Sequence, residues 1–128
     1  MDEPSDRTTT IQALRESVLA FRDERDWKQF HQSKDLAIAL AIEAAEILEH
    51  FRFQDDAAIA QRLSNADEQR AVAHELADVL HFVLLLSDAL GVDLIQALAE
   101  KLAISARRYP AALARGRAQK YTELGTEQ

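Results

Sequence analysis

The sequence contains no cysteine among its 128 residues, so disulfide bonds, thiolate metal sites and thiol nucleophiles are excluded. Glycine and proline are scarce, with three and two residues, and aromatic residues make up only 6%. So few turn-forming residues favour long helices with few connections over sheets. The composition therefore predicts an all-α protein. Its length suits one domain, which we place at residues 1–128 with flexible ends at 1–7 and 122–128.

A long hydrophobic stretch is also missing. The longest apolar run, residues 79–86, is interrupted by His81 and is much too short to span a bilayer. The first ten residues, MDEPSDRTTT, are acidic and polar, without the apolar segment that a secretory signal needs. We therefore expect a soluble cytoplasmic protein with no membrane partner.

Basic residues are scarce in most of the chain. The formal net charge of −7 argues against general binding to nucleic acid. The first hundred residues carry nine basic and twenty acidic side chains, whereas residues 101–120 carry six basic side chains and no acidic one. The side chains of this basic segment could bind phosphate oxygens, or they could simply be solvated.

Apolar residues recur three and four positions apart in the first half of the chain, which predicts two amphipathic helices. The first should begin after a cap within residues 8–10 and end near residues 22–27. The second should have Ser33 as its cap and run to about Phe53.

Residues 54–69 are polar and predict a connection with one short helix, in which Asn65 and Asp67 are candidate caps. A third helix is expected from about residue 68 to residue 90. Its VLHFVLLL stretch is apolar nearly all round, which is typical of a helix buried on every side.

Gly91 should end the third helix, and Asp93 should cap a fourth. The fourth should stop at Tyr109, because Pro110 disfavours helical geometry in the residue before it. The tail after Pro110 is expected to be irregular. Together the elements predict a bundle of four to five helices.

Two of the expected helices each carry a pair of carboxylates three residues apart, Glu43 with Glu46 and Glu75 with Asp78. Side chains three apart on a helix share a face, and both pairs lie among apolar residues. Packing the two helices together would bring four carboxylates to one place, where a divalent cation would offset their repulsion. An all-oxygen ligand set favours Mg²⁺, or Mn²⁺, over zinc. The alternative is two ordinary solvated helix faces, and spacing alone does not choose between them.

A cation held by carboxylates near Lys and Arg side chains is typical of phosphate chemistry, in which the metal binds phosphate oxygens and orients water. Five strings of the sequence, in chain order, are FRDERDWKQFH, LAIALAIEAAEILEHF, ELADVLHFVLLLSDALGVDL, RRYP and ARGRAQKYTEL. With these strings the chain resembles the MazG-like all-α nucleoside triphosphate pyrophosphohydrolases, and within them the dCTP pyrophosphatase branch. The match covers most of residues 21–124.

The resemblance implies that Glu43, Glu46, Glu75 and Asp78 form the catalytic centre and ligate Mg²⁺, although Glu46 could instead act as a general base. Water would attack the α-phosphorus of a nucleoside triphosphate and release the monophosphate and pyrophosphate. The resemblance also implies an intertwined homodimer or a dimer of dimers, that is, a homotetramer. The implied phosphate contacts are Lys101, Arg108, Lys120 and Tyr121, and the implied neighbours of the base are His31, Trp27, Phe53 and Phe82.

The chain departs from the branch at several of these positions. Phe53 stands where Trp is usual, Phe82 where Tyr is usual, and Asp35 and Ser105 each where Asn is usual. The preferred nucleotide therefore stays open, with dCTP-like pyrimidine substrates placed first. The alternative function is a non-catalytic helical module that binds nucleotide or a partner protein. A di-iron protein ranks third, because no helix carries the Glu-x-x-His pair that such a site needs.

Overall fold

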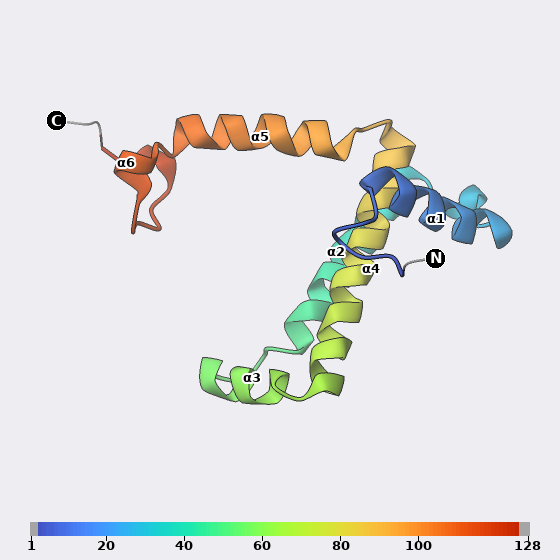
Figure 1. Ribbon diagram of the computed structural model, residues 1–128, viewed down its shortest axis with the longest axis horizontal. Helices are drawn as coiled ribbons and strands as arrows, with labels where there is room; N and C mark the ends of the chain where they lie inside the picture. Colours follow the sequence, from blue (N-terminus) through green and yellow to red (C-terminus); the bar gives the residue numbers. More distant parts are fainter. Residues whose placement is uncertain (1–2, 126–128) are drawn as a thin grey trace. The chain divides into compact units, whose positions relative to one another are not determined.

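The computed structural model describes residues 3–125, which form six α-helices and two short 3₁₀ helices without any strand (Figure 1). The elements are α1 (Ile11–Glu24), η1 (Lys28–Phe30), α2 (Ser33–Glu49), α3 (Asp56–Leu63), α4 (Ala66–Leu90), α5 (Leu94–Arg108), α6 (Ala111–Ala114) and η2 (Tyr121–Glu123). The predicted all-α class is confirmed. The ends predicted to be flexible lie partly outside the described residues. The chain divides into two compact units, Met1–Gly91 and Val92–Gln128.

The first unit is built on α2 and α4, which run side by side in opposite directions, with α3 connecting them at one end (Figure 1). Helix α1 packs against the C-terminal half of α4. Arg15 Nε on α1 donates to Ser87 Oγ at 3.1 Å, and the ring of Phe21 lies edge-on to His81 with 6.0 Å between centroids. These contacts place α1 beside the residues that follow the predicted carboxylate pair on α4.

A buried guanidinium also joins α1 to α4. Arg22 is 7% exposed, and its Nε donates to Asp23 Oδ1 at 2.8 Å while NH1 lies 3.5 Å from Asp88 Oδ2. Burying a charge is costly unless partners satisfy it, and the two carboxylates supply that compensation. Arg22 therefore links the end of α1 to the end of α4.

The fully buried apolar side chains of this unit are Leu36 on α2 and Leu84 and Leu85 on α4. In the single chain α4 is covered only in part, because Leu80 in the predicted apolar stretch is 40% exposed and Leu76, one turn before it, is 57% exposed. Burial stops there because α1 covers only the C-terminal half of α4. Among residues 3–125 no single helix is long and apolar enough to cross a membrane.

Most predicted helix boundaries are confirmed by caps. Thr10 Oγ1 accepts from the Ala13 N–H at 3.0 Å, and Asp93 Oδ1 accepts from the Gln96 N–H at 2.8 Å. Gly91 follows α4 in the left-handed conformation, with φ of 65°, which a residue without Cβ adopts readily.

Other boundaries differ from the prediction. Ser33 is the first residue of α2 rather than its cap, because Gln32 occupies the N-cap position without a side-chain hydrogen bond. Helix α2 ends at Glu49, four residues early, and Phe53 has φ of 60°, which is incompatible with a continued helix. Asp67 lies in the first turn of α4 and does not cap it.

The second unit contains α5, α6 and η2. Its tail is more ordered than predicted, because Leu113 N–H and Ala114 N–H bond back to the carbonyl of Pro110 at 3.0 and 2.9 Å. Proline suits this position, since its missing N–H is not needed at the start of a helix. Leu124, near the end of the described residues, is buried.

The cap of α4 gives a first test. Asn65 Oδ1 accepts from the N–H groups of Asp67 at 2.9 Å and Glu68 at 3.3 Å. Asn65→Ala should lower the free energy of unfolding by about 1 kcal/mol, measured by urea denaturation, because two N–H groups lose their acceptor. Asn65→Asp keeps an acceptor and should lose much less, and equal losses from the two variants would contradict the cap.

Candidate metal centre

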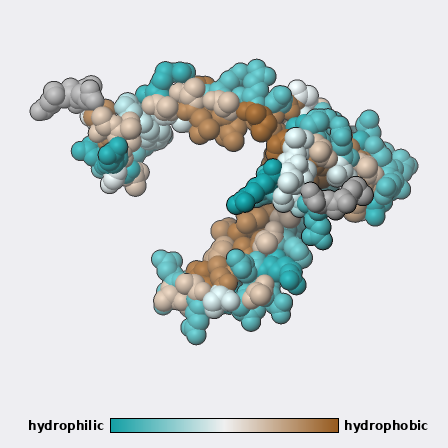
Figure 2. All heavy atoms as spheres, viewed as in Figure 1, coloured by the Kyte–Doolittle hydropathy of each residue, from teal (hydrophilic) through white to brown (hydrophobic). Residues whose placement is uncertain are grey.

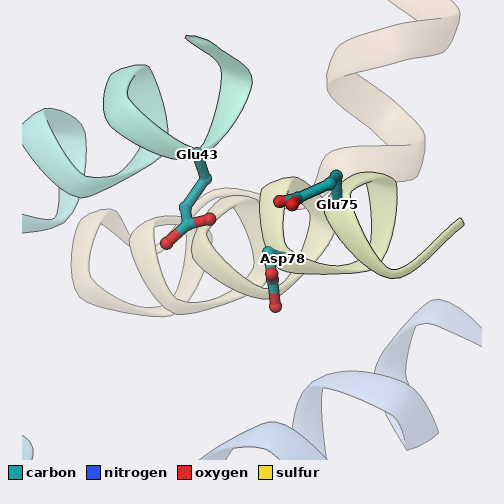
Figure 3. Close-up of side chains that lie close together, drawn as sticks. All are labelled: Glu43, Glu75 and Asp78. Carbon is teal, nitrogen blue, oxygen red and sulfur yellow. The ribbon is translucent and has the colours of Figure 1, made fainter. Parts of the chain in front are cut away.

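Three carboxylates from two helices converge at the middle of the α2–α4 pair. Glu43 extends from α2 toward Glu75 and Asp78 on α4, and Glu75 reaches back toward Glu43 (Figure 3). One oxygen from each carboxylate lies within 4.8 Å of the other two. Glu43 and Glu75 are half-buried and Asp78 is exposed, so the cluster lies at an edge that remains open to solvent.

Burial and neighbouring negative charges disfavour the charged form of Glu43. Burial raises the pKa of Glu43 above its ordinary value, and the negative charges of Asp78, Glu75 and Glu46 raise it further. Glu43 therefore lies close to other negative charges. A bound cation would reverse that repulsion, because it attracts every carboxylate in the cluster.

The donor set fits a hard divalent cation. All the ligand atoms are carboxylate oxygens, which Mg²⁺ and Mn²⁺ prefer. Two oxygens bound to one Mg²⁺ at about 2.1 Å can lie at most about 4.2 Å apart. The observed limit of 4.8 Å is slightly wider, so small rotations of the side chains would bring all three within reach of one ion.

Glu46, the fourth predicted ligand, is not part of this group of three. It lies on α2 one turn after Glu43 and is exposed. Its charge still contributes to the raised pKa of Glu43, so it lies close to the cluster. The structure thus brings together three of the four predicted ligands and leaves Glu46 beside them.

One neighbour of the cluster was not predicted from the sequence. His50 is the C-cap of α2, and its Nε2 lies 3.7 Å from Oε1 of Glu75. The signal was available in the sequence, because residues seven apart on a helix share a face and Glu43 precedes His50 by seven. The prediction from the sequence covered only the carboxylates.

A cavity of about 250 Å³ lies between α1 and α4, lined by Ser17, Val18 and Phe21 of α1 and by His81 of α4. His81 follows Asp78 by one helical turn, about 4.5 Å along the axis. His81 therefore lines a cavity one helical turn from Asp78.

Two of the residues predicted to lie near the base contact rings that line this cavity. Trp27 meets Phe21 edge-on at 5.9 Å between centroids, and Phe82 meets His81 edge-on at 5.4 Å. Aromatic edges and faces in such arrangements attract one another beyond the area that they bury. The cavity is thus bordered by a continuous series of rings.

His31 lies close enough to affect the cavity electrostatically. Burial lowers the pKa of His31, and the positive charge of Arg22 lowers it further. The pKa of His81 is also lowered, first by burial and then by His31, against an opposing effect of Asp78. Both imidazoles therefore favour the neutral form, in which one ring nitrogen donates and the other accepts a hydrogen bond.

Phe53 lies apart, in the turn between α2 and α3. Its side chain is 95% exposed, and its backbone has φ of 60°, a conformation that residues other than glycine seldom adopt. The guanidinium of Arg52 lies 5.1 Å from the centre of the Phe53 ring. Exposing a large aromatic side chain on strained backbone is unfavourable for folding, and such features gather at functional sites.

The predicted phosphate contacts all belong to the Val92–Gln128 unit. The guanidinium of Arg108 lies 5.1 Å from the centre of the Tyr121 ring, and Tyr121 meets Tyr109 edge-on at 5.9 Å. Lys120 is the exposed N-cap of η2, and Lys101 is exposed on α5. The structure thus brings Arg108 and Tyr121 together.

The chain is similar to known proteins of one family. The profile of the MazG-like family matches residues 38–124, which include the three clustered carboxylates. The chain is 40% identical over 115 residues to dCTP pyrophosphatase 1 of Homo sapiens, and 38% identical to that of Rattus norvegicus. Each alignment covers 90% of this chain and 68% of the relative.

A solved structure of a pyrophosphatase from Archaeoglobus fulgidus has a similar fold, with a TM-score of 0.72 and 30% sequence identity. The similarity covers 86% of this chain and 98% of that protein. The profile match spans more than half of the chain, and the human relative is similar over nine tenths of it. The chain belongs to the MazG-like family.

Proposed function

We propose that this chain is a nucleoside triphosphate pyrophosphohydrolase that uses Mg²⁺, or Mn²⁺ in its place, and acts as a single domain. The observation that carries the proposal is the convergence of Glu43, Glu75 and Asp78 within 4.8 Å across two helices. Three such carboxylates are well suited to hold a divalent cation and poorly suited to remain without one. The names of the human relative and of the archaeal structure support the same activity.

The reaction is attack of water on the α-phosphorus. A bond forms from the water oxygen to that phosphorus, and the bond to the oxygen that bridges the α- and β-phosphorus breaks, which releases monophosphate and pyrophosphate. When bound, the cation supplies positive charge to the phosphate oxygens and orients them. Glu46 is our candidate for the base that accepts a proton from water, because it lies beside the cluster without belonging to it.

The proposed substrate is a deoxynucleoside triphosphate with a pyrimidine base similar to that of dCTP. The cavity between α1 and α4 begins one turn from Asp78, which suits a base whose phosphates reach the carboxylates. Trp27, Phe82 and His31 lie around it and can provide stacking and hydrogen bonds. Phe53 is a further candidate for stacking because it is 95% exposed.

Lys101, Arg108, Lys120 and Tyr121 are the proposed phosphate contacts. The charges of the three basic side chains complement the triphosphate oxygens that the cation does not bind, and a hydrogen bond between charged groups is stronger than one between neutral groups. The hydroxyl of Tyr121 is a neutral donor. Arg108 is already held against the Tyr121 ring, which limits the freedom that it would lose on binding phosphate.

The carboxylates give the test of mechanism. Glu43→Gln, Glu75→Gln and Asp78→Asn should each remove most turnover and weaken binding of Mn²⁺. Glu46→Gln should lower kcat by about 10²- to 10⁴-fold, as expected for a general base, while leaving Mn²⁺ affinity nearly unchanged. Release of monophosphate and pyrophosphate from a panel of nucleotides, with and without a chelator, measures turnover, and the spin-resonance signal of free Mn²⁺ measures its binding.

The matched control is Glu49→Gln, because Glu49 is an exposed carboxylate on α2 that pairs with Arg52 at 3.3 Å. It should change neither kcat nor Mn²⁺ affinity. At neutral pH Glu43→Gln should also raise the Tm of the metal-free chain, since the raised pKa of Glu43 means that its charge opposes folding there. Full wild-type turnover in the absence of divalent ions would contradict the mechanism.

Base preference gives a further test. Phe53 can stack on a base, worth roughly 1–3 kcal/mol, but it offers no N–H, and Phe82 lacks the hydroxyl that Tyr would provide. Fewer donors should mean weaker discrimination, so we expect activity on dCTP and on at least one other pyrimidine deoxynucleotide. Phe53→Trp should sharpen the preference, measured as ratios of kcat/KM. A wild-type preference for dCTP of about a thousandfold or more would contradict this reasoning.

We also propose assembly as a homodimer or a dimer of dimers. Exposed apolar residues four apart occur on α2, at Ile38 and Ile42, and on α4, at Leu76 and Leu80. Figure 2 shows hydrophobic side chains along the α2–α4 pair and along α5. Water-exposed stripes of this kind mark surfaces that another chain covers. Light scattering at micromolar concentration should show at least a dimer, Ile38→Glu should weaken it, and a stable monomer of the unmodified chain would contradict the proposal.

A further inference from the structure

We propose that His50 is a positioning residue for Glu75. Its Nε2–H holds one oxygen of the Glu75 carboxylate, so that the other oxygen stays available to a divalent cation. The proposal rests on the proposed function, because it needs a cation at the three carboxylates. It adds a residue outside the predicted ligand set, and it gives α3 a part in the site.

The contact between the two side chains is specific to Glu75. His50 Nε2 lies 3.7 Å from Glu75 Oε1, and the two side chains are only 20% and 25% exposed. Among the described residues, neither Glu43 nor Asp78 has a basic side chain at ion-pair distance. The separation is slightly longer than a hydrogen bond, so a small rotation of either side chain brings the N–H onto the oxygen.

The position of His50 is fixed from two sides. Its own N–H bonds to the carbonyl of Ile47 at 3.2 Å, and its carbonyl accepts hydrogen bonds from the guanidinium of Arg62 and from Gln54 Nε2, the latter at 3.3 Å. Arg62 lies near the end of α3 and also reaches Glu68 of α4, with Nε 3.7 Å from Oε2. Helix α3 therefore holds the last turn of α2 against the start of α4, and the imidazole stays beside Glu75.

The chemistry of a carboxylate ligand explains why such a partner is useful. A carboxylate has two oxygens, so it can accept a hydrogen bond at one while the other binds a cation. Partners of this kind orient the ligand, and removing one typically costs 10- to 100-fold in metal affinity or activity. An N–H on Nε2 is present in the protonated ring and in one neutral tautomer, so the role does not depend on the charge of His50.

Three substitutions separate the donor from the ring. His50→Gln places an amide N–H about as far along the side chain as Nε2, whereas the amide of His50→Asn reaches only as far as Nδ1. His50→Leu has no donor. The matched control is His74→Leu, because His74 lies beside Glu75 on α4 and is exposed. Binding of Mn²⁺ alone to the full chain is measured by the spin-resonance signal of the free ion, and the Tm of each metal-free variant is recorded.

We expect His50→Leu and His50→Asn to weaken Mn²⁺ binding by about 10- to 100-fold, while His50→Gln and His74→Leu stay close to the wild type. The metal-free Tm of His50→Gln and of His50→Asn should match. The comparison of Mn²⁺ affinity between these two variants then stays valid even if His50→Leu folds poorly. In the turnover assay, the Mg²⁺ concentration needed for half-maximal rate should rise for His50→Asn and not for His50→Gln.

The outcomes separate this proposal from the one on which it rests. Unchanged Mn²⁺ affinity in His50→Asn and His50→Leu would overturn the role of His50 and leave the proposed metal site intact. Equal weakening of Mn²⁺ binding by His50→Gln and His50→Asn would also overturn it, because the imidazole ring and not the N–H donor would then matter. A wild-type chain that binds no Mn²⁺ would overturn the metal site, and the role of His50 with it.

Discussion

The repulsion among Glu43, Glu75 and Asp78 is the constraint around which the first unit is organised. Three carboxylates within 4.8 Å oppose the packing of the two helices that carry them, so those helices must be held together elsewhere. Leu36 on α2 and the pair Leu84 and Leu85 on α4 supply that apolar contact further along the same helices. The cluster can then remain open to solvent without the helices separating.

Helices that carry none of the three carboxylates support the two helices that do. Helix α1 covers the C-terminal half of α4, and the buried Arg22 joins the ends of both helices through Asp88. At the other end, Arg62 of α3 holds the carbonyl of His50. The site therefore lies between two anchored ends of the α2–α4 pair. This arrangement leaves the apolar residues on its middle uncovered, which accounts for the exposure of Leu76 and Leu80.

Local rules in the sequence predicted much of the fold, because they act over a few residues. The caps at Thr10, Asn65 and Asp93 and the stop at Gly91 each depend on a side chain or a missing Cβ close to the backbone that it affects. The end of α2 was missed because its pattern allows a helix to continue to Phe53, and only the turn into α3 interrupts it. The sequence predicted that α4 is apolar nearly all round but not which neighbours cover it, because hydrophobicity reports a preference for contact, not the presence of a neighbour.

For the site, the sequence by itself determined the helical class, the two carboxylate pairs and their preference for a hard cation, since spacing and side-chain chemistry are properties of each helix alone. Only the tertiary structure decided that Glu43, Glu75 and Asp78 meet while Glu46 stays beside them, because that depends on the register of α2 against α4. The same register brings His50 to Glu75, and the packing of α1 on α4 brings His81 to the cavity between those two helices. Contacts between residues far apart in the chain follow from packing, which no local pattern encodes.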